Sequence, residues 1–392
     1  MSPRFLLLAG GLMAAGLASA ADRPARPAAR PEKSAAGAEA FAAELRTAYS
    51  KKPADWPKPT VDAGVAFAEL GPTPPPAYPK DNPYSKDKDL LGRTLFFDPR
   101  LSGSGQIACA SCHDPDLGWA DGRTTSFGHG RLLLKRNAPS VLNAGHGAAF
   151  FWDGRAKTLE EQAQAVFLNP DEMRGTKDDI LATLSKSAGY RGLFEKAFGS
   201  PEVTWDRVGQ AVATFERGVV GGGSRFDAFL KGKPDALSDS EVRGLHLFRT
   251  DARCVNCHNG PLLTDGKFHD LGLHNIGRPF EDLGRYRITK DPADVGRFKT
   301  PSLRNVGRTA PYMHSGLFDL DVLLTLYNAG MPNPRKPKEL PADAPPFPEK
   351  SPLVKPLGLN KQDLADLKAF LLALDEPRRV VRPPDLPPLG KE

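Results

Sequence analysis

Two segments of the chain carry apolar residues at helical spacing. The first stripe consists of Val208, Val212 and Phe215. The second stripe consists of Leu364, Leu367, Leu371 and Leu374. Each stripe is followed by residues that end helices, glycines at 221–223 and Pro377 respectively, so both segments are predicted to be amphipathic helices. A capping-box sequence at 238–241, Ser-Asp-Ser-Glu, predicts that a further helix begins there.

Alternating patterns typical of strands are sparse, and glycine and proline are frequent, at 38 residues each. We therefore expect a mostly α-helical fold with long loops rich in glycine and proline. Residues 5–17 form an apolar run after a positive charge, and a small-residue Ala-Ser-Ala site follows at 18–20. This pattern predicts a signal peptide over residues 1–20 and an exported, periplasmic protein. The run is too short to span a bilayer, so no membrane anchor is expected.

The chain after the signal divides into a linker and two repeated halves. Residues 21–80 are rich in alanine and proline and are predicted to form a linker or loosely docked arm. In each half a Pro-Ser pair is followed, at the same two spacings, by an asparagine and a glycine: Pro139, Asn143 and Gly154, and Pro301, Asn305 and Gly316. This agreement predicts an internal duplication, with domains at 81–222 and 223–380 and a tail at 381–392.

Composition narrows the classes of function. With 40% hydrophobic and 26% charged residues, the chain is similar to ordinary soluble proteins. Its formal net charge of +6 is too small to indicate nucleic-acid binding. Only four cysteines are present, and all belong to two Cys-x-x-Cys-His motifs: Cys109, Cys112 and His113, and Cys254, Cys257 and His258.

These two motifs predict two covalently attached c-type haems. The two thiols of such a motif add to the haem vinyl groups, and the adjacent histidine binds the iron as its proximal ligand. The alternatives are a zinc site, a redox-active dithiol and structural disulfides. A four-cysteine zinc site would not account for a histidine at the same offset in both motifs, and a thioredoxin-type dithiol would need a βαβ pattern, which the sequence lacks. We therefore expect His113 and His258 to be proximal ligands.

The opposite side of each iron decides the chemistry. A sixth protein ligand favours electron transfer, whereas an open position can bind peroxide or oxygen. Composition alone leaves ten candidates for a sixth ligand: His129, His146, His246, His269, His274, His314, Met173, Met313, Met331 and Tyr327. For most of them the simpler interpretation is a surface histidine or a core methionine.

Several further motifs accompany the haem motifs in a fixed order. In the first half they are Leu-Phe-Phe-Asp-Pro-Arg-Leu-Ser at 95–102, Asn-Ala-Pro-Ser at 137–140, Phe-Trp-Asp-Gly-Arg at 151–155 and Asn-Pro-Asp-Glu-Met at 169–173. In the second half they are Phe-Lys-Thr-Pro-Ser-Leu-Arg-Asn at 298–305 and Thr-Ala-Pro-Tyr-Met-His at 309–314. Over residues 80–376 the chain thus resembles the bacterial dihaem cytochrome c peroxidases, a family that includes the MauG-type enzymes. The resemblance implies two tandem cytochrome c-like domains, each with one covalent haem c.

The same resemblance assigns roles in the first half. The N-terminal haem is where peroxide reacts, and Glu172 lies over its distal face. A carboxylate there can take a proton from the iron-bound oxygen and return it to the departing one, although a glutamate can also simply favour a helix N-terminus. Gln162 matches a glutamine of the same pocket. Trp152 matches a tryptophan that relays electrons between the haems, although a buried tryptophan is more often part of a core.

Three further assignments follow from the resemblance. A calcium ion between the domains is bound by oxygens of Asn137, Thr309 and Pro311, the last two through their carbonyl groups. His129 matches a loop histidine that caps the N-terminal iron of many resting peroxidases and leaves once the other haem is reduced. Tyr327 stands where many peroxidases have a methionine as sixth ligand of the C-terminal haem and MauG-type proteins have tyrosine, with Met331 as the alternative. Phenolate stabilises ferric iron, whereas a thioether raises the potential.

Three functions therefore stay open. The leading hypothesis is a periplasmic dihaem peroxidase that reduces hydrogen peroxide to water, with electrons from a small c-type cytochrome or cupredoxin. A MauG-like enzyme would instead use peroxide to oxidise residues of a partner protein. A dihaem electron carrier without catalysis would have two permanently six-coordinate haems. Dimers are common in the family, so a homodimer is an assembly that the resemblance allows.

Overall fold

The structure is a computed structural model that describes residues 27–32 and 34–389, so the expected signal peptide lies outside the described residues. The helices before and within the first half are α1 (Ala35–Tyr49), α2 (Lys86–Phe97), α3 (Leu159–Leu168), α4 (Lys177–Lys186), α5 (Ala188–Phe198) and α6 (Trp205–Gly218). Those of the second half are α7 (Arg225–Leu230), α8 (Asp239–Arg249), α9 (Tyr286–Thr289), α10 (Leu320–Asn328) and α11 (Lys361–Leu372). Within the described residues the one sheet pairs β1 (Phe268–His269) with β2 (Phe298–Lys299), antiparallel. The prediction of a mostly helical chain is confirmed.

The helix signals in the sequence are confirmed at the expected places. The first apolar stripe belongs to α6 and the second to α11, except that Leu374 lies just beyond the last residue of α11, and α8 begins after Ser238. There the Ser238 hydroxyl accepts from the Glu241 amide at 3.3 Å, and the Glu241 carboxylate accepts from the Ser238 amide at 2.7 Å. These bonds satisfy two of the free N–H groups at the helix start.

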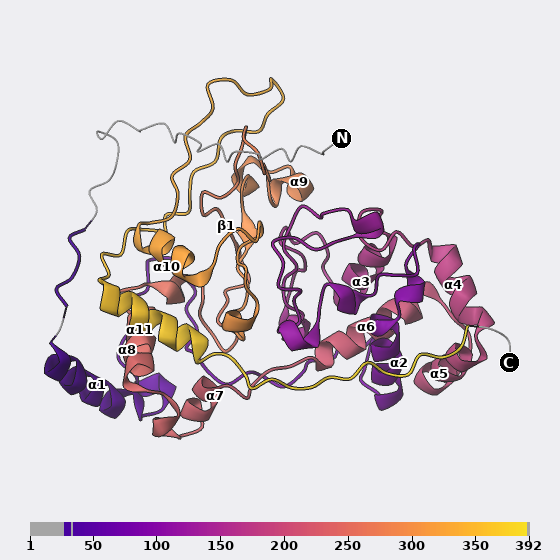
Figure 1. Ribbon diagram of the computed structural model, residues 1–392, viewed down its shortest axis with the longest axis horizontal. Helices are drawn as coiled ribbons and strands as arrows, with labels where there is room; N and C mark the ends of the chain where they lie inside the picture. The colour runs from indigo at the N-terminus through magenta and orange to yellow at the C-terminus, as the bar shows by residue number, and fades with distance from the viewer. Residues whose placement is uncertain (1–26, 33, 390–392) are drawn as a thin grey trace, which may run out of the picture.

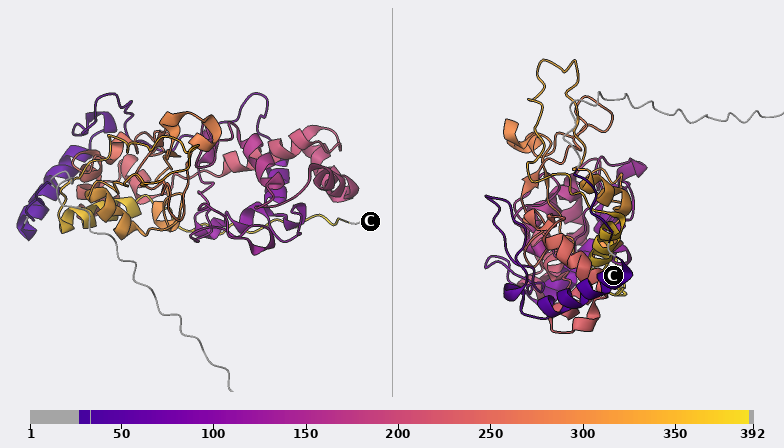
Figure 2. Two further views of the ribbon diagram at one scale, coloured as in Figure 1. Left: turned by 90° about the horizontal axis from the view of Figure 1, so that it is seen from above. Right: turned by 90° about the vertical axis from the view of Figure 1, so that its left-hand side faces the viewer.

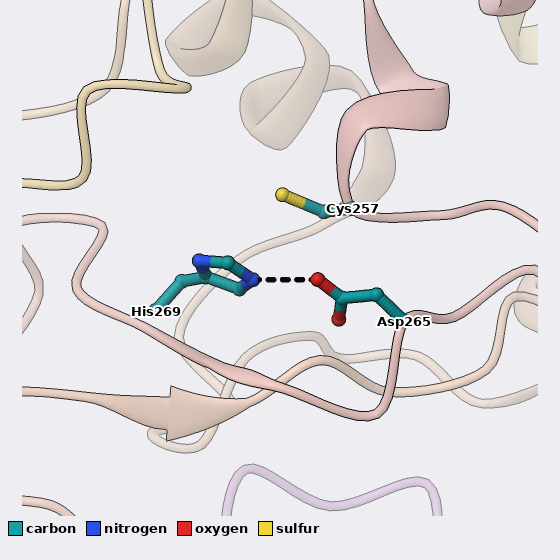
Figure 3. A group of neighbouring side chains, drawn as sticks. All are labelled: Cys257, Asp265 and His269. Atoms are coloured by element: carbon teal, nitrogen blue, oxygen red, sulfur yellow. Dashed lines mark hydrogen bonds and ion pairs between the residues drawn. The ribbon is translucent and has the colours of Figure 1, made fainter. Parts of the chain in front are cut away.

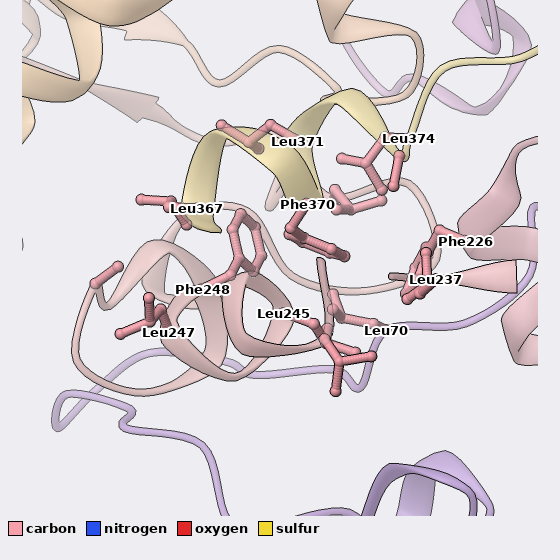
Figure 4. Close-up of a cluster of buried hydrophobic side chains, with 14 of the residues drawn as sticks. Leu70, Phe226, Leu237, Leu245, Leu247, Phe248, Leu367, Phe370, Leu371 and Leu374 are labelled. Carbon is pink, nitrogen blue, oxygen red and sulfur yellow. The ribbon is translucent and has the colours of Figure 1, made fainter. Parts of the chain in front are cut away.

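The two halves lie side by side along the longest axis, each with its own core (Figures 1 and 2). In the first half α2 packs against α6, with α3 and α5 beside them. In the second half α8 packs against α11, and Figure 4 shows Phe248 of α8 facing Leu367 and Phe370 of α11. The loop between α10 and α11 projects from the second half (Figure 1).

The same helix crossing occurs in both halves, and each depends on a glycine. A Cβ atom on Gly92 of α2 would overlap the carbonyl oxygen of Ala211 in α6. A Cβ atom on Gly244 of α8 would overlap the carbonyl oxygen of Asp366 in α11 in the same way. The missing side chain lets the helix backbones touch, which supports the internal duplication inferred from the sequence.

Hydrogen bonds repeat as well. The Asn143 amide donates to the Val219 carbonyl at 2.8 Å, and the Asn305 amide donates to the Leu374 carbonyl at 3.2 Å. The side-chain oxygen of Asn143 accepts from the Gly221 amide at 2.9 Å, and that of Asn305 accepts from the Glu376 amide at 2.6 Å. Both asparagines have a φ of 62°, in the left-handed region that asparagine tolerates best after glycine. These loops therefore have one conformation in both halves.

The two ends of the chain each pack on the half that is remote in sequence. Part of the segment expected to be a linker or loosely docked arm forms α1 and contributes Tyr49 and Trp56, 2% and 6% exposed, to the core of the second half. The carbonyl oxygens of Pro387 and Pro388, in the tail, accept from Arg100 at 3.0 Å and Ser187 at 2.6 Å in the first half. The described part of the arm is thus closely docked, because its large apolar side chains are buried there. The exact domain boundaries stay a prediction.

No helix within residues 27–32 and 34–389 combines the length and the apolar character that crossing a membrane requires.

The glycine crossing yields a stability prediction. Gly244→Ala places a methyl group against the Asp366 carbonyl, so we expect the free energy of unfolding to fall by about 1–3 kcal/mol, as for other overpacked cores. Gly192→Ala in α5 is the control, because no atom lies within 4 Å of its Cβ position. That change should raise stability by about 0.5–1 kcal/mol, since alanine is the better helix former. Urea unfolding measures both, and equal effects would contradict the proposed crossing.

Candidate haem-binding site

One cavity of about 1810 Å³ lies between the two halves. All four cysteines and both motif histidines line it, together with most of the residues that the resemblance assigned. Sites for single small molecules are usually about 300–1,000 Å³. The cavity is thus large enough for more than one such group, and the two motifs approach it from opposite halves.

Each motif histidine is held in the same way. His113 and His258 follow the short turns Cys109–Ser111 and Cys254–Asn256. The Nδ1 atom of His113 lies 3.1 Å from the Trp119 carbonyl oxygen, and that of His258 lies 3.0 Å from the Leu263 carbonyl oxygen. A carbonyl can only accept, so Nδ1 carries the proton and Nε2 keeps a lone pair for a metal. Burial lowers the pKa of both histidines, which favours the neutral ring that metal binding needs.

The cysteines fit haem attachment better than the alternatives. All four are free thiols in the structure. Burial raises the pKa of Cys112 to about 11 and of Cys254 and Cys257 to about 12, and it also raises the pKa of Cys109. Redox-active dithiols depend on a thiolate with a lowered pKa, whereas the pKa of all four of these thiols is raised. Two cysteines and a histidine with a free Nε2, all on one cavity wall in each half, are the residues that a c-type haem requires.

A histidine and an aspartate accompany the second motif (Figure 3). His269 Nε2 lies 2.8 Å from Asp265 Oδ2, and ligand atoms of both residues and of Cys257 lie within 4.8 Å of one another. Burial acts to raise the pKa of Asp265, but the hydrogen bond with His269 and a backbone amide outweigh it and lower the pKa. Because Cys257 belongs to the haem motif, we assign no separate metal to this group.

The predicted acid-base residue lies on the cavity wall of the first half. Asn169 Nδ2 donates to Glu172 Oε1 at 2.8 Å, and an Arg155 nitrogen lies 3.9 Å from the same oxygen. Burial raises the pKa of Glu172, and Arg155 opposes this only in part. Gln162, on α3, lines the same cavity. Asn169 and Arg155 are not among the site residues predicted from the sequence, although both stand inside the motifs at 169–173 and 151–155.

Trp152 connects the two halves. Its indole N–H donates to the Asn137 carbonyl oxygen at 2.9 Å, and its own carbonyl oxygen accepts from the Lys299 amide of β2 at 2.8 Å. Its ring centre lies 6.4 Å from that of His314, edge to face. The indole is 9% exposed and lines the cavity at the junction of the two halves, and its role as an electron relay stays a prediction.

The three expected calcium ligands lie at the same junction. Asn137, Thr309 and Pro311 all line the cavity, and the Asn137 amide donates to the His314 carbonyl at 2.8 Å. The side-chain nitrogen of Asn137 donates to the Arg123 carbonyl at 2.7 Å, which leaves the side-chain oxygen directed elsewhere. Calcium binding by these residues stays a prediction.

The cavity divides the ten candidates for a sixth ligand. Those that line it are His146, His269, His314, Met173, Met313 and Tyr327. Those that do not line it are His129, His246, His274 and Met331. Tyr327 is half-buried on α10, and its pKa is raised by burial of the phenol and further by Cys257 and Cys254, so the phenol lies near the second motif. Met331 instead belongs to an apolar cluster with Leu273 and Leu323.

His129 does not face the cavity in this arrangement. Its amide donates to the Asp171 carbonyl at 3.0 Å, and its ring Nδ1 is buried without a hydrogen-bond partner. Its loop neighbours Phe127 and Gly128 do line the cavity. A role as a switching ligand therefore requires the loop to move, and it stays a prediction.

Comparisons with known proteins agree on one family. A sequence model of the di-haem cytochrome c peroxidases matches residues 86–235. The methylamine utilization protein MauG of Methylorubrum extorquens is 40% identical over 316 residues, which are 79% of this chain and 84% of that protein. Cytochrome c551 peroxidase of Nitrosomonas europaea is 44% identical over 238 residues, 60% of this chain and 70% of that protein. The crystal structure of a MauG-like protein associated with microbial copper homeostasis has 35% identity and a TM-score of 0.69, and the match covers 81% of this chain and 96% of that chain.

The haem content can be tested motif by motif. We expect two covalently bound haems per chain, because each motif supplies two thiols and one histidine to the cavity. Replacing Cys109 and Cys112 by serine should remove one of them, and replacing Cys254 and Cys257 should remove the other. Haem staining after denaturing electrophoresis, with iron analysis, measures this. Full covalent haem content in either double variant would contradict the assignment.

Proposed function

Because the chain belongs to the di-haem cytochrome c peroxidase family, we propose that it is an exported peroxidase that reduces hydrogen peroxide to water with electrons from a small redox protein. Membership of the family makes it an oxidoreductase of the peroxidase type. The observation that carries the proposal is Glu172, a half-buried carboxyl held by Asn169 on the cavity wall beside the first motif.

Two haems, one on each motif, would supply the redox chemistry. The protein's part in the first half is to hold and move protons at Glu172. Asn169 fixes Oε1, so the proton exchanges at Oε2. The raised pKa keeps that proton available closer to neutral pH, where an acid-base group works best, and Arg155 at 3.9 Å stabilises the anion that is left.

We propose that electrons enter at the second motif and cross by way of Trp152. The support for this route is position, because Trp152 is bonded to Asn137 of the first half and to Lys299 of the second. A c-type cytochrome or cupredoxin would be the donor, and peroxide the acceptor. Calcium at Asn137, Thr309 and Pro311 would hold the two halves at this junction.

A MauG-like activity is the second candidate, and the position of Tyr327 favours it. Tyr327 lines the cavity near Cys254 and Cys257, whereas Met331 does not reach the cavity wall. A phenolate ligand would lower the potential of the second haem, which is unfavourable for accepting electrons from a high-potential cytochrome. A MauG-like enzyme would draw its oxidising power from peroxide and its electrons from residues of a partner protein, so it would not depend on such a cytochrome.

The acid-base role predicts a loss of peroxide turnover in Glu172→Gln. The amide keeps the size of the side chain but cannot exchange a proton, so we expect peroxide reduction with a reduced c-type cytochrome to slow by about 100-fold or more. Glu161→Gln is the matched control, because that glutamate is exposed on α3. The control should keep the wild-type rate. Equal rates in Glu172→Gln and wild type would refute the role of Glu172.

The ligand of the second haem predicts a spectroscopic difference between two variants. If Tyr327 binds the iron, the absorption band of a ferric phenolate disappears in Tyr327→Phe and persists in Met331→Leu. Absorption and resonance Raman spectra of the oxidised protein measure this. A sulfur-to-iron band that is lost in Met331→Leu would instead identify the methionine and remove the support for the MauG-like candidate.

A further inference from the structure

Glu216 is a second carboxyl on the wall of the first half. It lies on α6 beside the haem motif, is 5% exposed and lines the cavity. Its Oε2 atom is buried without a hydrogen-bond partner. Its charge acts on Cys109, as does that of Glu172. The Glu216 carboxyl is therefore desolvated, and Oε2 is free to bind or release a proton beside a group that fills the cavity.

The duplication shows that the fold does not require a carboxyl there. The Cβ atom of Phe215 lies next to Gly92, and that of Phe370 lies next to Gly244, so these two phenylalanines correspond. The next residue is Glu216 in the first half and Leu371 in the second. Leu371 is 5% exposed and also lines the cavity. The same wall position is thus ionisable only in the half where peroxide is proposed to react.

Few charges surround Glu216. Arg217 on the same helix and Glu160 on α3 act on it, but they bond to each other at 2.6 and 2.9 Å and largely cancel. From the turn Ala144–His146, which packs against α6, the titratable group is His146, and burial lowers its pKa.

On α2 the buried Lys88 acts on Glu160 and Arg217, and these two residues are the charges that act on Glu216 itself. Cys109 loses its ionisable thiol once a haem is attached, and α2 presents the apolar Phe96 to Phe215. Burial therefore dominates and raises the pKa of Glu216 to about 8.

We propose that Glu216 is a redox-linked proton site of the first haem, taking up one proton when that haem gains an electron and releasing it when the electron leaves. This inference rests on haem binding at His113, as in the proposed function. Reduction of one peroxide to two waters consumes two electrons and two protons. Glu172 shuttles a proton between the two peroxide oxygens, whereas Glu216 holds one of the protons that must come from solvent.

The sign of the coupling follows from electrostatics. An electron added close to a buried carboxyl raises its affinity for a proton, because the low dielectric screens the interaction weakly. Around pH 8 the carboxyl is near half-titration, so reduction there is accompanied by proton uptake. The midpoint potential of the first haem must then fall as the pH rises through this window.

Spectroelectrochemical titration of the dihaem protein between pH 6 and 10 tests the proposal without peroxide turnover. We expect the wild-type potential of the first haem to fall around pH 8 with a slope approaching one proton per electron. Glu216→Gln should flatten that slope, because the amide cannot exchange a proton. Glu216→Leu, which copies the second half, should do the same. Glu161→Gln, at an exposed glutamate of α3, is the control and should keep the slope.

Two outcomes would overturn the proposal. One is an unchanged slope in both Glu216 variants, and the other is a slope lost in Glu172→Gln alone. The potential of the second haem serves as an internal reference, because Leu371 stands at the matched position there and the Glu216 variants should leave its pH dependence as in the wild type. A flattened slope in Glu216→Gln together with no peroxide turnover in the wild type would uphold this inference and refute the proposed peroxidase function.

Discussion

The structure depends on one hydrogen bond that occurs twice, from a motif histidine to a backbone carbonyl. Trp119 and Leu263 provide these carbonyls from left-handed backbone, at φ of 64° and 51°. Non-glycine residues in that region cost about 1–2 kcal/mol each, and both halves accept the cost at the same place. Without this bond the imidazole could turn, and Nε2 would no longer face the cavity. The core helices, the repeated asparagine loops and the glycine crossings all fix the chain around this geometry.

Neither half encloses the cavity alone, so contacts between the halves are part of the site. Arg136 of the first half donates to Asp153 at 2.6 Å and to Asp282 of the second half at 2.6 and 2.9 Å. These side chains are mostly buried, and a paired buried arginine is costly to break. Arg136 also lies over the ring of Phe298, which stacks on His314 at 3.6 Å. Trp152 is therefore held between two surfaces that cannot slide freely.

Local signals in the sequence could be predicted, and contacts between distant residues could not. The stripe before the glycines and the capping box at Ser238 need only neighbours a few residues away, and both helices form as expected. The docking of α1 depends on Tyr49 and Trp56 meeting Arg249, about which the alanine- and proline-rich composition says nothing. The choice between Tyr327 and Met331 also needed the structure. Because they are four residues apart, they would share a face of a continuous helix. However, α10 ends at Asn328, and Met331 lies after the following turn and itself has a φ of 58°.

The duplicated framework makes the differences between the halves informative, because the fold itself tolerates either residue at matched positions. The cavity wall of the first half carries Glu216, which is buried, and Glu172, which is half-buried, and burial raises the pKa of both. The second half has Leu371 at the position that matches Glu216. The phenol of Tyr327 lies near the motif cysteines of that half. Peroxide reduction consumes protons, whereas passing an electron through a haem with a sixth ligand need not. Desolvated carboxyls are costly to bury, and the second half has Leu371 at the position of Glu216, so packing alone does not account for the carboxyl of Glu216.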